Sequence, residues 1–415
     1  MACTPIARLV AAAIITSSSF VAAEPLALDL RTALDRAHRF APDAVAARGA
    51  IAEAEAGRVG AALAFTANPE VEIGAGPRFS TPRQLDLDAS IAQSLEPGRR
   101  GARRHLAGAS VDHARADGEA RLRELDLAVA FAFYDALAAE QSVALAARAA
   151  ELAERGSVVA DRRRKAGDIT DLDANLARVA LGRARSALQA EQVERAKSLS
   201  VIAGLVGAGP ADDIVLRGEL GGAADPERDA GAAGDPGPTT TDALASRADV
   251  RALDAERVVA SAERANAAAA ARPDVTIWAS YQREDATNIV LAGLRLTLPI
   301  WNSGDGEQAV ARAKERRATE MRAAVLATAS RQVVDAATTY AAARRALGTF
   351  ESEVAPVLDD SEKLLQRSVD AGQIAIADFL VVRQELAAGR RDQLERRLAV
   401  AKAAVALRYA AGGVP

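Results

Sequence analysis

The sequence predicts a mostly α-helical protein with a smaller membrane-spanning β portion. Half of the 415 residues are hydrophobic but only 3% are aromatic. Much of the apolar content is alanine, which is the strongest helix former and lets helices pack closely. Two segments instead alternate apolar and polar residues, as strands do. The order of helix, strand pair and helical hairpin occurs twice, which indicates an internal duplication.

The first 23 residues have the features of a secretory signal peptide. Arg8 precedes a short apolar run, and the small residues Ala22 and Ala23 end it. Cys3 is the only cysteine and lies in this segment. A mature chain that begins at Glu24 would therefore contain no disulfide and no cysteine-based metal site.

Residues 24–206 form the first predicted repeat. A helical pattern over 28–66 pauses at Pro42, and strands are expected at about 70–77 and 85–95. Heptad-like apolar spacing then predicts a helical hairpin over about 101–206, broken at the sequence RKAGD.

A connector, residues 207–241, is rich in Gly, Pro and Asp and is expected to have little regular structure. The second repeat, residues 242–415, then follows the order of the first. Its strands are predicted at about 273–283 and 288–299, and its helical hairpin at about 305–410. The stretch AGDITDLDANL in the first hairpin corresponds to AGQIAIADFLV in the second.

Four such strands pose a physical problem, because each is long enough to cross a bilayer and one face of each pair is apolar. The smallest membrane barrels need about eight strands. An open sheet in lipid would leave the amides of its edges unpaired. Three copies would supply twelve strands, so we expect a trimeric, 12-stranded barrel. The polar residues expected to line its lumen are Glu72, Asp86, Asp88, Ser90, Ser94, Thr276, Arg295 and Thr297.

The chain resembles the outer membrane efflux proteins, the TolC-like family, over nearly the whole expected mature sequence. The resemblance rests on the duplicated order and on LEPGRRGARR, LRLTLPIWNSGDGEQAVARA and the two hairpin stretches quoted above. The metal-efflux branch, which includes CzcC and CusC, is the most similar. This resemblance implies a homotrimer whose 12-stranded barrel crosses the outer membrane and whose long α-helical barrel crosses the periplasm.

The same resemblance implies a passive conduit that is not an enzyme. Its partners would be a periplasmic adaptor (membrane fusion) protein, an inner-membrane pump of the RND type and the lipid of the outer membrane. Its substrates would be small solutes such as metal cations or drugs. Two alternatives stay open: an exit duct for type I protein secretion, and a soluble periplasmic coiled-coil scaffold.

The hairpin tips are the candidate functional sites that the resemblance implies. Asp378, and with less support Asp173, would face the narrow periplasmic mouth, where a ring of carboxylates favours cations. Each could equally be an acidic residue in a first helical turn, stabilised by the helix dipole. Val381 stands where the family's mouth has a second aspartate. The residues expected to dock on the adaptor are Lys165, Ala166, Gly167, Asp168, Ala371, Gly372 and Gln373.

Other chemistry is sparse in the sequence. His38, His105 and His113 are the only histidines, and their spacing does not favour a shared metal. No catalytic triad motif or phosphate-binding loop is present, so we expect no cofactor, no metal site and no catalysis. The formal net charge of −4 argues against nucleic acid as a partner.

Overall fold

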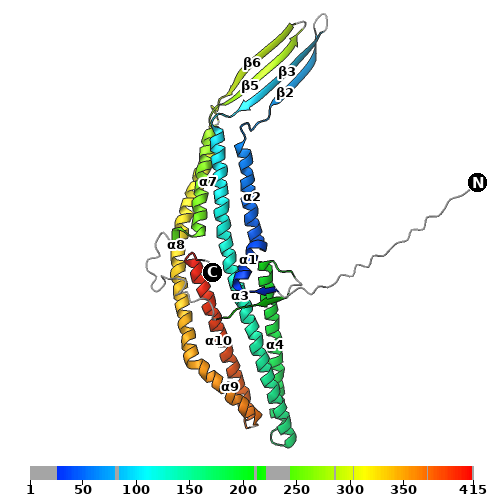
Figure 1. Ribbon diagram of the computed structural model, residues 1–415, viewed down its shortest axis with the longest axis vertical. Helices are drawn as coiled ribbons and strands as arrows, with labels where there is room; N and C mark the ends of the chain where they lie inside the picture. The colour runs from blue at the N-terminus through cyan, green and yellow to red at the C-terminus, as the bar shows by residue number, and fades with distance from the viewer. Residues whose placement is uncertain are drawn as a thin grey trace, which may run out of the picture.

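The computed structural model describes residues 26–79, 84–209, 213–220, 244–284, 287–301, 303–371 and 373–413. The predicted signal peptide (1–23), most of the connector (207–241) and Gly372 lie outside the described residues. The described chain is long and narrow, with strands at one end and helical hairpins at the other (Figure 1).

Four helices lie side by side next to the strands. They are α2 (Pro42–Ala62), α3 (Arg99–Ala166), α7 (Ala248–Ala270) and α8 (Asp305–Thr349). Each contacts the next in the order α2, α3, α7, α8. The 68 residues of α3 correspond to roughly 100 Å at 1.5 Å per residue, so this helix runs past the rest of the layer.

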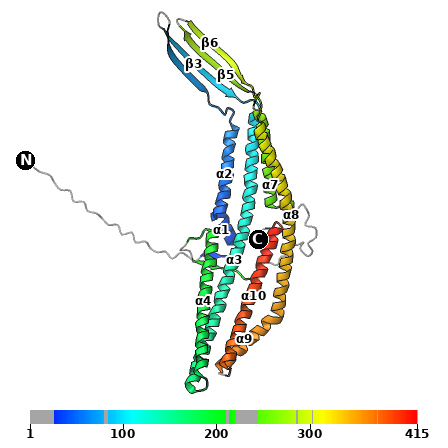
Figure 2. The same ribbon diagram turned by 180° about the vertical axis from the view of Figure 1, so that it is seen from behind.

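The half of the molecule away from the strands repeats this arrangement with different helices. Here α4 (Asp171–Val206) and α10 (Ile376–Ala410) lie on either side of α3, and α8 with its continuation α9 (Ala355–Asp370) lies beyond α10. Figures 1 and 2 show α4 on one flank and α8 on the other in both views. The helices therefore form one layer whose two flanks are not covered by the described chain.

A π-helical segment, Phe350–Val354, separates α8 from α9. The segment lies inside the predicted helical hairpin of residues 305–410, where the chain stays helical but its hydrogen-bonding pattern changes. Pro356 occupies the first turn of α9 and has no N–H to donate to the preceding turn, which is a recognised cause of such bulges and kinks. The bend directs α9 toward the lower end of α10 (Figure 1).

The strands β2 (Glu70–Arg78), β3 (Gln84–Leu95), β5 (Asp274–Glu284) and β6 (Thr287–Thr297) form one antiparallel sheet in that order. They lie within two residues of the four predicted strands. Because β3 pairs with β5, the two repeats meet in the middle of the sheet, and β2 and β6 are its open edges.

One face of this sheet is apolar across all four strands. The register places Val71, Ile91, Ala279 and Ala292 in a single cross-strand row. Ile73 is 79% exposed in the single chain, so nothing in the described chain covers this face. The opposite face carries Glu72, Ser90 and Ser280 in one row, as the alternation predicted, but it also carries Trp278, which packs over Gly293.

A small belt packs against one side of the middle of α3 (Figures 1 and 2). It consists of β1 (Leu26–Leu28), α1 (Leu30–Phe40) and β4 (Ile214–Leu216), with β1 and β4 paired in parallel. No strand is predicted in the connector, but the structure places the three-residue strand β4 there. Ile214 and Leu216 are buried against the core, and this burial stabilises a strand of only three residues.

The largest hydrophobic core lies at the same level, where Leu28, Val129, Ile202 and Val206 pack together. One described helix, α3, contains an 18-residue window with mean hydropathy 1.2, and 44% of this window is buried inside the chain. The buried apolar residues of α3 from Leu125 to Ala138 belong to this core, so packing accounts for their apolar character.

Replacing Ile202 by alanine should destabilise this core. Ile202 is fully buried, so the cavity is expected to cost about 2–5 kcal/mol of unfolding free energy. The matched control is Ser200→Ala on the same helix, where the side chain is exposed. Urea denaturation followed by circular dichroism would measure both. Equal stability of the two variants would contradict the core assignment.

Candidate functional site

The first hairpin turns at Gly167, as the sequence predicted. The helix α3 ends at Ala166, and Gly167 adopts φ 83°, a left-handed conformation that glycine tolerates best. The amide of Gly167 donates to the carbonyl of Arg164 at 3.0 Å, and that of Asp168 donates to the carbonyl of Arg163 at 2.9 Å. These two bonds satisfy carbonyls at the helix end and fix a compact tip.

Asp173 is held by a capping box at the start of α4. The backbone amide of Asp173 donates to the hydroxyl of Thr170 at 3.2 Å, and the hydroxyl of Thr170 donates to the Asp173 carboxylate at 2.7 Å. The Thr170 amide donates to the same carboxylate at 3.2 Å. The carboxylate of Asp173 is therefore engaged in stabilising the helix start.

Asp378 occupies the matching third position of α10, but its surroundings differ. The N-cap residue there is Ala375, which has no side-chain oxygen, and no capping bond forms. Asp378 is exposed, and its carboxylate has no hydrogen-bond or ion-pair partner among the described residues. Its neighbours Ile376 and Phe379 are buried and anchor the opposite side of the helix. Of the two predicted mouth residues, Asp378 is thus the one with a free carboxylate.

Basic side chains surround the first tip, and two of them have hydrogen-bond or ion-pair partners. Arg163 donates to the carbonyl of Ile374 at 2.9 Å, which joins the two hairpin tips, and Arg164 pairs with Asp171 at 3.2 Å. Arg162 and Lys165 are exposed and have no partner among the described residues.

A second ion pair crosses the first hairpin above its tip. Arg178 of α4 donates to the carboxylate of Asp161 of α3 at 3.0 Å, and this bond lowers the pKa of Asp161. The pair links the two helices of the hairpin near their turn.

The predicted docking residues lie at the lower end of the molecule on both hairpins. Lys165, Ala166 and Asp168 are exposed on the first tip, and Ala371 and Gln373 are exposed on the second. The second turn is closed by the amide of Gln373, which donates to the carbonyl of Ser368 at 3.0 Å.

A close contact between the hairpins was not apparent from the sequence. Phe379 of α10 is 2% exposed, and a Cβ atom at Gly156 of α3 would lie 2.5 Å from its ring atom Cζ. Leu365, Val369 and Leu386 complete the cluster around this ring. A glycine inside a long helix is the only sequence signal that could have marked the contact.

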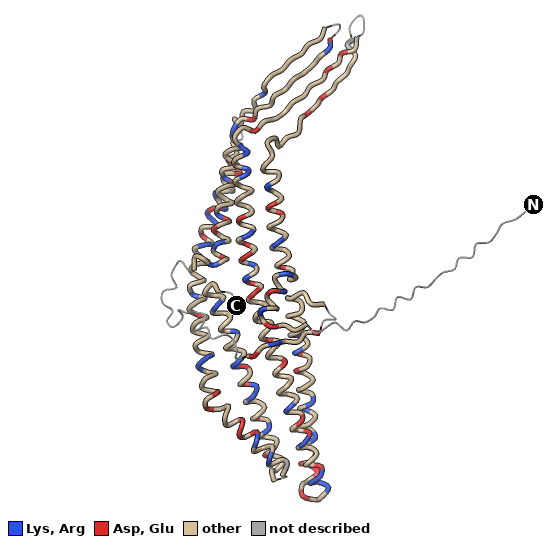
Figure 3. The backbone as a smooth tube through the Cα atoms, in the orientation of Figure 1, with Lys and Arg blue, Asp and Glu red and all other residues tan. Residues whose placement is uncertain are grey.

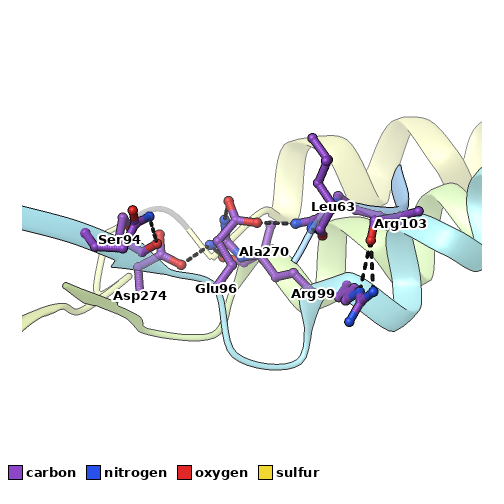
Figure 4. A network of polar contacts seen from close by, with 10 residues as sticks. Leu63, Ser94, Glu96, Arg99, Arg103, Ala270 and Asp274 are labelled. Atoms are coloured by element: carbon purple, nitrogen blue, oxygen red, sulfur yellow. Dashed lines mark hydrogen bonds and ion pairs between the residues drawn. The ribbon is translucent and has the colours of Figure 1, made fainter. Parts of the chain in front are cut away.

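Polar contacts at the other end join the sheet to the helices (Figure 4). Glu96, after the end of β3, pairs with Arg103 and with Arg99, the latter at 3.6 Å. Arg99 also donates to the carbonyl of Ala270 at 2.8 Å, and Arg103 donates to that of Leu63 at 3.1 Å. The arginines of LEPGRRGARR therefore bind the C-terminal ends of α7 and α2, where cations are favoured.

No metal-ligand cluster of three or more His, Cys, Asp or Glu side chains occurs in the part of the chain that the structure describes. His38 instead contacts Asp126, with Nε2 2.5 Å from the carboxylate, beside the central core. Burial raises the pKa of Asp126, and the contact with His38 opposes this shift.

Comparisons with known proteins agree with this architecture. Residues 240–413 match the family model described as Outer membrane efflux protein. No curated protein gave a significant match.

Solved structures share the fold at low sequence identity. The chain is similar to CusC, with 16% identity, 92% of each chain covered and a TM-score of 0.74. It is also similar to CmeC of Campylobacter jejuni (16% identity, 92% and 85% covered, TM-score 0.72). For VceC of Vibrio cholerae the values are 18% identity, 92% and 96% coverage and a TM-score of 0.68.

The predicted resemblance to the outer membrane efflux proteins is thereby confirmed, as is the mostly helical TolC-like fold. The proteins of this family are passive conduits, so the expectation that the chain is not an enzyme is confirmed on that ground.

Alanine at Gly156 should displace the ring of Phe379 and loosen the contact between the hairpins. The matched control is Gly182→Ala on α4, where no atom lies within 4 Å of the added Cβ. Both changes gain the same helix propensity. The overpacked variant should therefore be about 1–3 kcal/mol less stable than the control in urea denaturation. Equal stabilities would show that Phe379 does not fill this position.

Proposed function

We propose that this chain, whose residues 240–413 belong to the outer membrane efflux protein family, is the outer-membrane channel subunit of a tripartite efflux system. It would be a passive conduit for small solutes. The observation that carries the proposal is the four-stranded sheet with one uncovered apolar face and two open edges, attached to a helix layer whose flanks are equally open.

Assembly into a homotrimer is the first part of the proposal. The edge strand β2 is on the side of the sheet that α2 joins, whereas β6 is on the side that α8 joins (Figure 1). Pairing of β6 with β2 of the next copy would satisfy both edges and bring the two helical flanks together. Head-to-tail contacts of this kind generate a closed ring when the rotation allows it. Three copies would give twelve strands around one lumen.

The same surfaces indicate how the protein would be oriented in the membrane. The apolar face of the sheet would contact outer-membrane lipid, and the face with Glu72 and Ser90 would line the water-filled lumen. The helices would continue the tube into the periplasm for roughly 100 Å, the length of α3. Export across the inner membrane would use the predicted signal peptide, residues 1–23.

The hairpin tips would be the site of adaptor docking. Ala166, Asp168, Ala371 and Gln373 are exposed at the end of the molecule farthest from the sheet, and Gly167 makes the first tip narrow. The adaptor would connect the channel to an inner-membrane pump of the RND type, which would supply the energy. Metal cations and drugs are the proposed substrates.

Asp378 would contribute one carboxylate from each copy to the periplasmic mouth. The free carboxylate of Asp378 supports this role, whereas the capping bonds of Asp173 favour a mainly structural one. A ring of three carboxylates would attract cations and repel anions.

Replacing Asp378 by asparagine should reduce the cation selectivity of the reconstituted channel. Asp173→Asn is the matched control and should leave selectivity nearly unchanged, because the carboxylate of Asp173 is engaged in the capping box. Single-channel recordings in asymmetric potassium chloride would measure the reversal potential of each variant. An unchanged reversal potential for Asp378→Asn would contradict the proposed mouth.

Cysteine scanning tests the docking site, because Cys3 is the only natural cysteine and lies in the predicted signal peptide. Ala166→Cys and Gln373→Cys should cross-link to an adaptor expressed in the same cells. Val59→Cys, which is 72% exposed near the sheet, should not. Cross-linking of the Val59→Cys variant, without cross-linking of the two tip variants, would contradict docking at the hairpin tips.

A further inference from the structure

An open groove of about 510 Å³ lies between the C-terminal end of α2 and the first turns of α3. Arg58 lines it from α2, and Arg104 and His105 line it from α3, with small residues such as Ala61 and Gly101 between them. We propose that this groove binds the phosphate group of a phospholipid in the periplasmic leaflet of the outer membrane.

The charge of the groove supports an anionic ligand. Its titratable lining residues are two arginines and a histidine, and no carboxylate lines it. Arg58, Arg104 and His105 are exposed and have no partner among the described residues. Guanidinium groups match the geometry of phosphate oxygens and can bind them through two parallel hydrogen bonds.

The other arginines nearby are already occupied, which distinguishes the groove from a generally basic surface. Arg100 donates to the carbonyl of Ala62 at 3.2 and 3.0 Å, and Arg103 donates to that of Leu63. Arg115, further along α3, pairs with Glu55 at 2.7 Å. Among the arginines of α2 and of the part of α3 before Leu125, Arg58 and Arg104 are therefore the ones without a described partner, and Figure 3 shows blue segments at the upper ends of these helices.

The groove lies at the level where lipid headgroups are expected. Arg104 is the sixth residue of α3, so it lies only about 8 Å along the helix from Arg99, and three residues separate Arg99 from the end of β3. Leu63 and Phe65, which connect α2 to β2, are 51% and 58% exposed, and Leu63 directly follows Ala62, which lines the groove. The arginines would bind the phosphate of a phospholipid headgroup, and the apolar side chains would contact its acyl chains. A free phosphate ion would use only the first of these two surfaces.

The groove also opens on the outer side of the tube. Glu96 continues the polar positions of β3, and it holds Arg99 and Arg103 on that luminal side. A helix turns about 100° per residue, so Arg104 and His105 lie 100° or more around α3 from both arginines. They therefore face away from the lumen, toward the side of the apolar sheet face.

The test measures lipid retained by the purified full-length protein in detergent, by native mass spectrometry, after addition of phosphatidylglycerol. Arg58→Gln and Arg104→Gln should each lower the apparent affinity about fivefold, since one arginine near a lipid surface contributes about 1 kcal/mol. The matched control is Arg183→Gln, an exposed arginine of α4 without a described partner, and it should bind as the unmodified protein does.

Two further ligands distinguish the sources of phosphate. A diacylglycerol that lacks phosphate should bind at least fivefold more weakly than phosphatidylglycerol, and millimolar inorganic phosphate should not displace the lipid. Equal binding of diacylglycerol, displacement by inorganic phosphate, or full retention in both arginine variants would each overturn the lipid site.

The inference rests on the proposed function only in that the sheet must lie in the membrane. Conductance of the same preparations in planar bilayers separates the two. Channels that conduct but show no headgroup preference would overturn the groove alone, whereas a protein that never inserts would overturn both.

Discussion

The backbone amides and carbonyls along the outer edges of β2 and β6 are the constraint on which the rest of the structure depends. In the described sheet the four strands are paired in the order in which they occur in the chain. The outer edges of β2 and β6 have no partner strand in the described chain. An edge strand in hydrocarbon costs several kcal/mol for each unsatisfied group. A chain with only four strands cannot remove its own edges, so its membrane portion is incomplete without further copies.

The helical portion has the same incompleteness, and this agreement between two unrelated elements strengthens the inference. At both heights four helices form a single layer, with α3 and α8 shared between the two levels. Exposed apolar residues lie along the flanks, among them Leu172 on α4 and Val357 on α9. The arginine contacts around Glu96 and Arg99 fix how the sheet meets this layer, so one rotation between copies could close both parts (Figure 4).

Much of this fold could be predicted from local pattern, and the exceptions have physical causes. Alternation around Val71 and Ile91 located the strands, and Gly167 located the first tip. The strand β4 was missed because its stability comes from burial of Ile214 against a distant core. The contact of Phe379 with Gly156 and the bond from Arg99 to Ala270 join residues far apart in sequence, so no local pattern encodes them. The difference between Asp173 and Asp378 depends on Thr170, and the sequence Thr170-Asp171-Leu172-Asp173 carries that capping signal, whereas Ala375 interrupts it in the second hairpin.

The number of copies in the membrane-inserted particle tests the central claim most directly. Electron cryo-microscopy of the full chain reconstituted in lipid nanodiscs would count subunits and trace the strands at each subunit boundary. The account predicts three copies, with β6 of each hydrogen-bonded to β2 of the next in a barrel of twelve strands. A single copy inserted in lipid with its four-stranded sheet still open would contradict it.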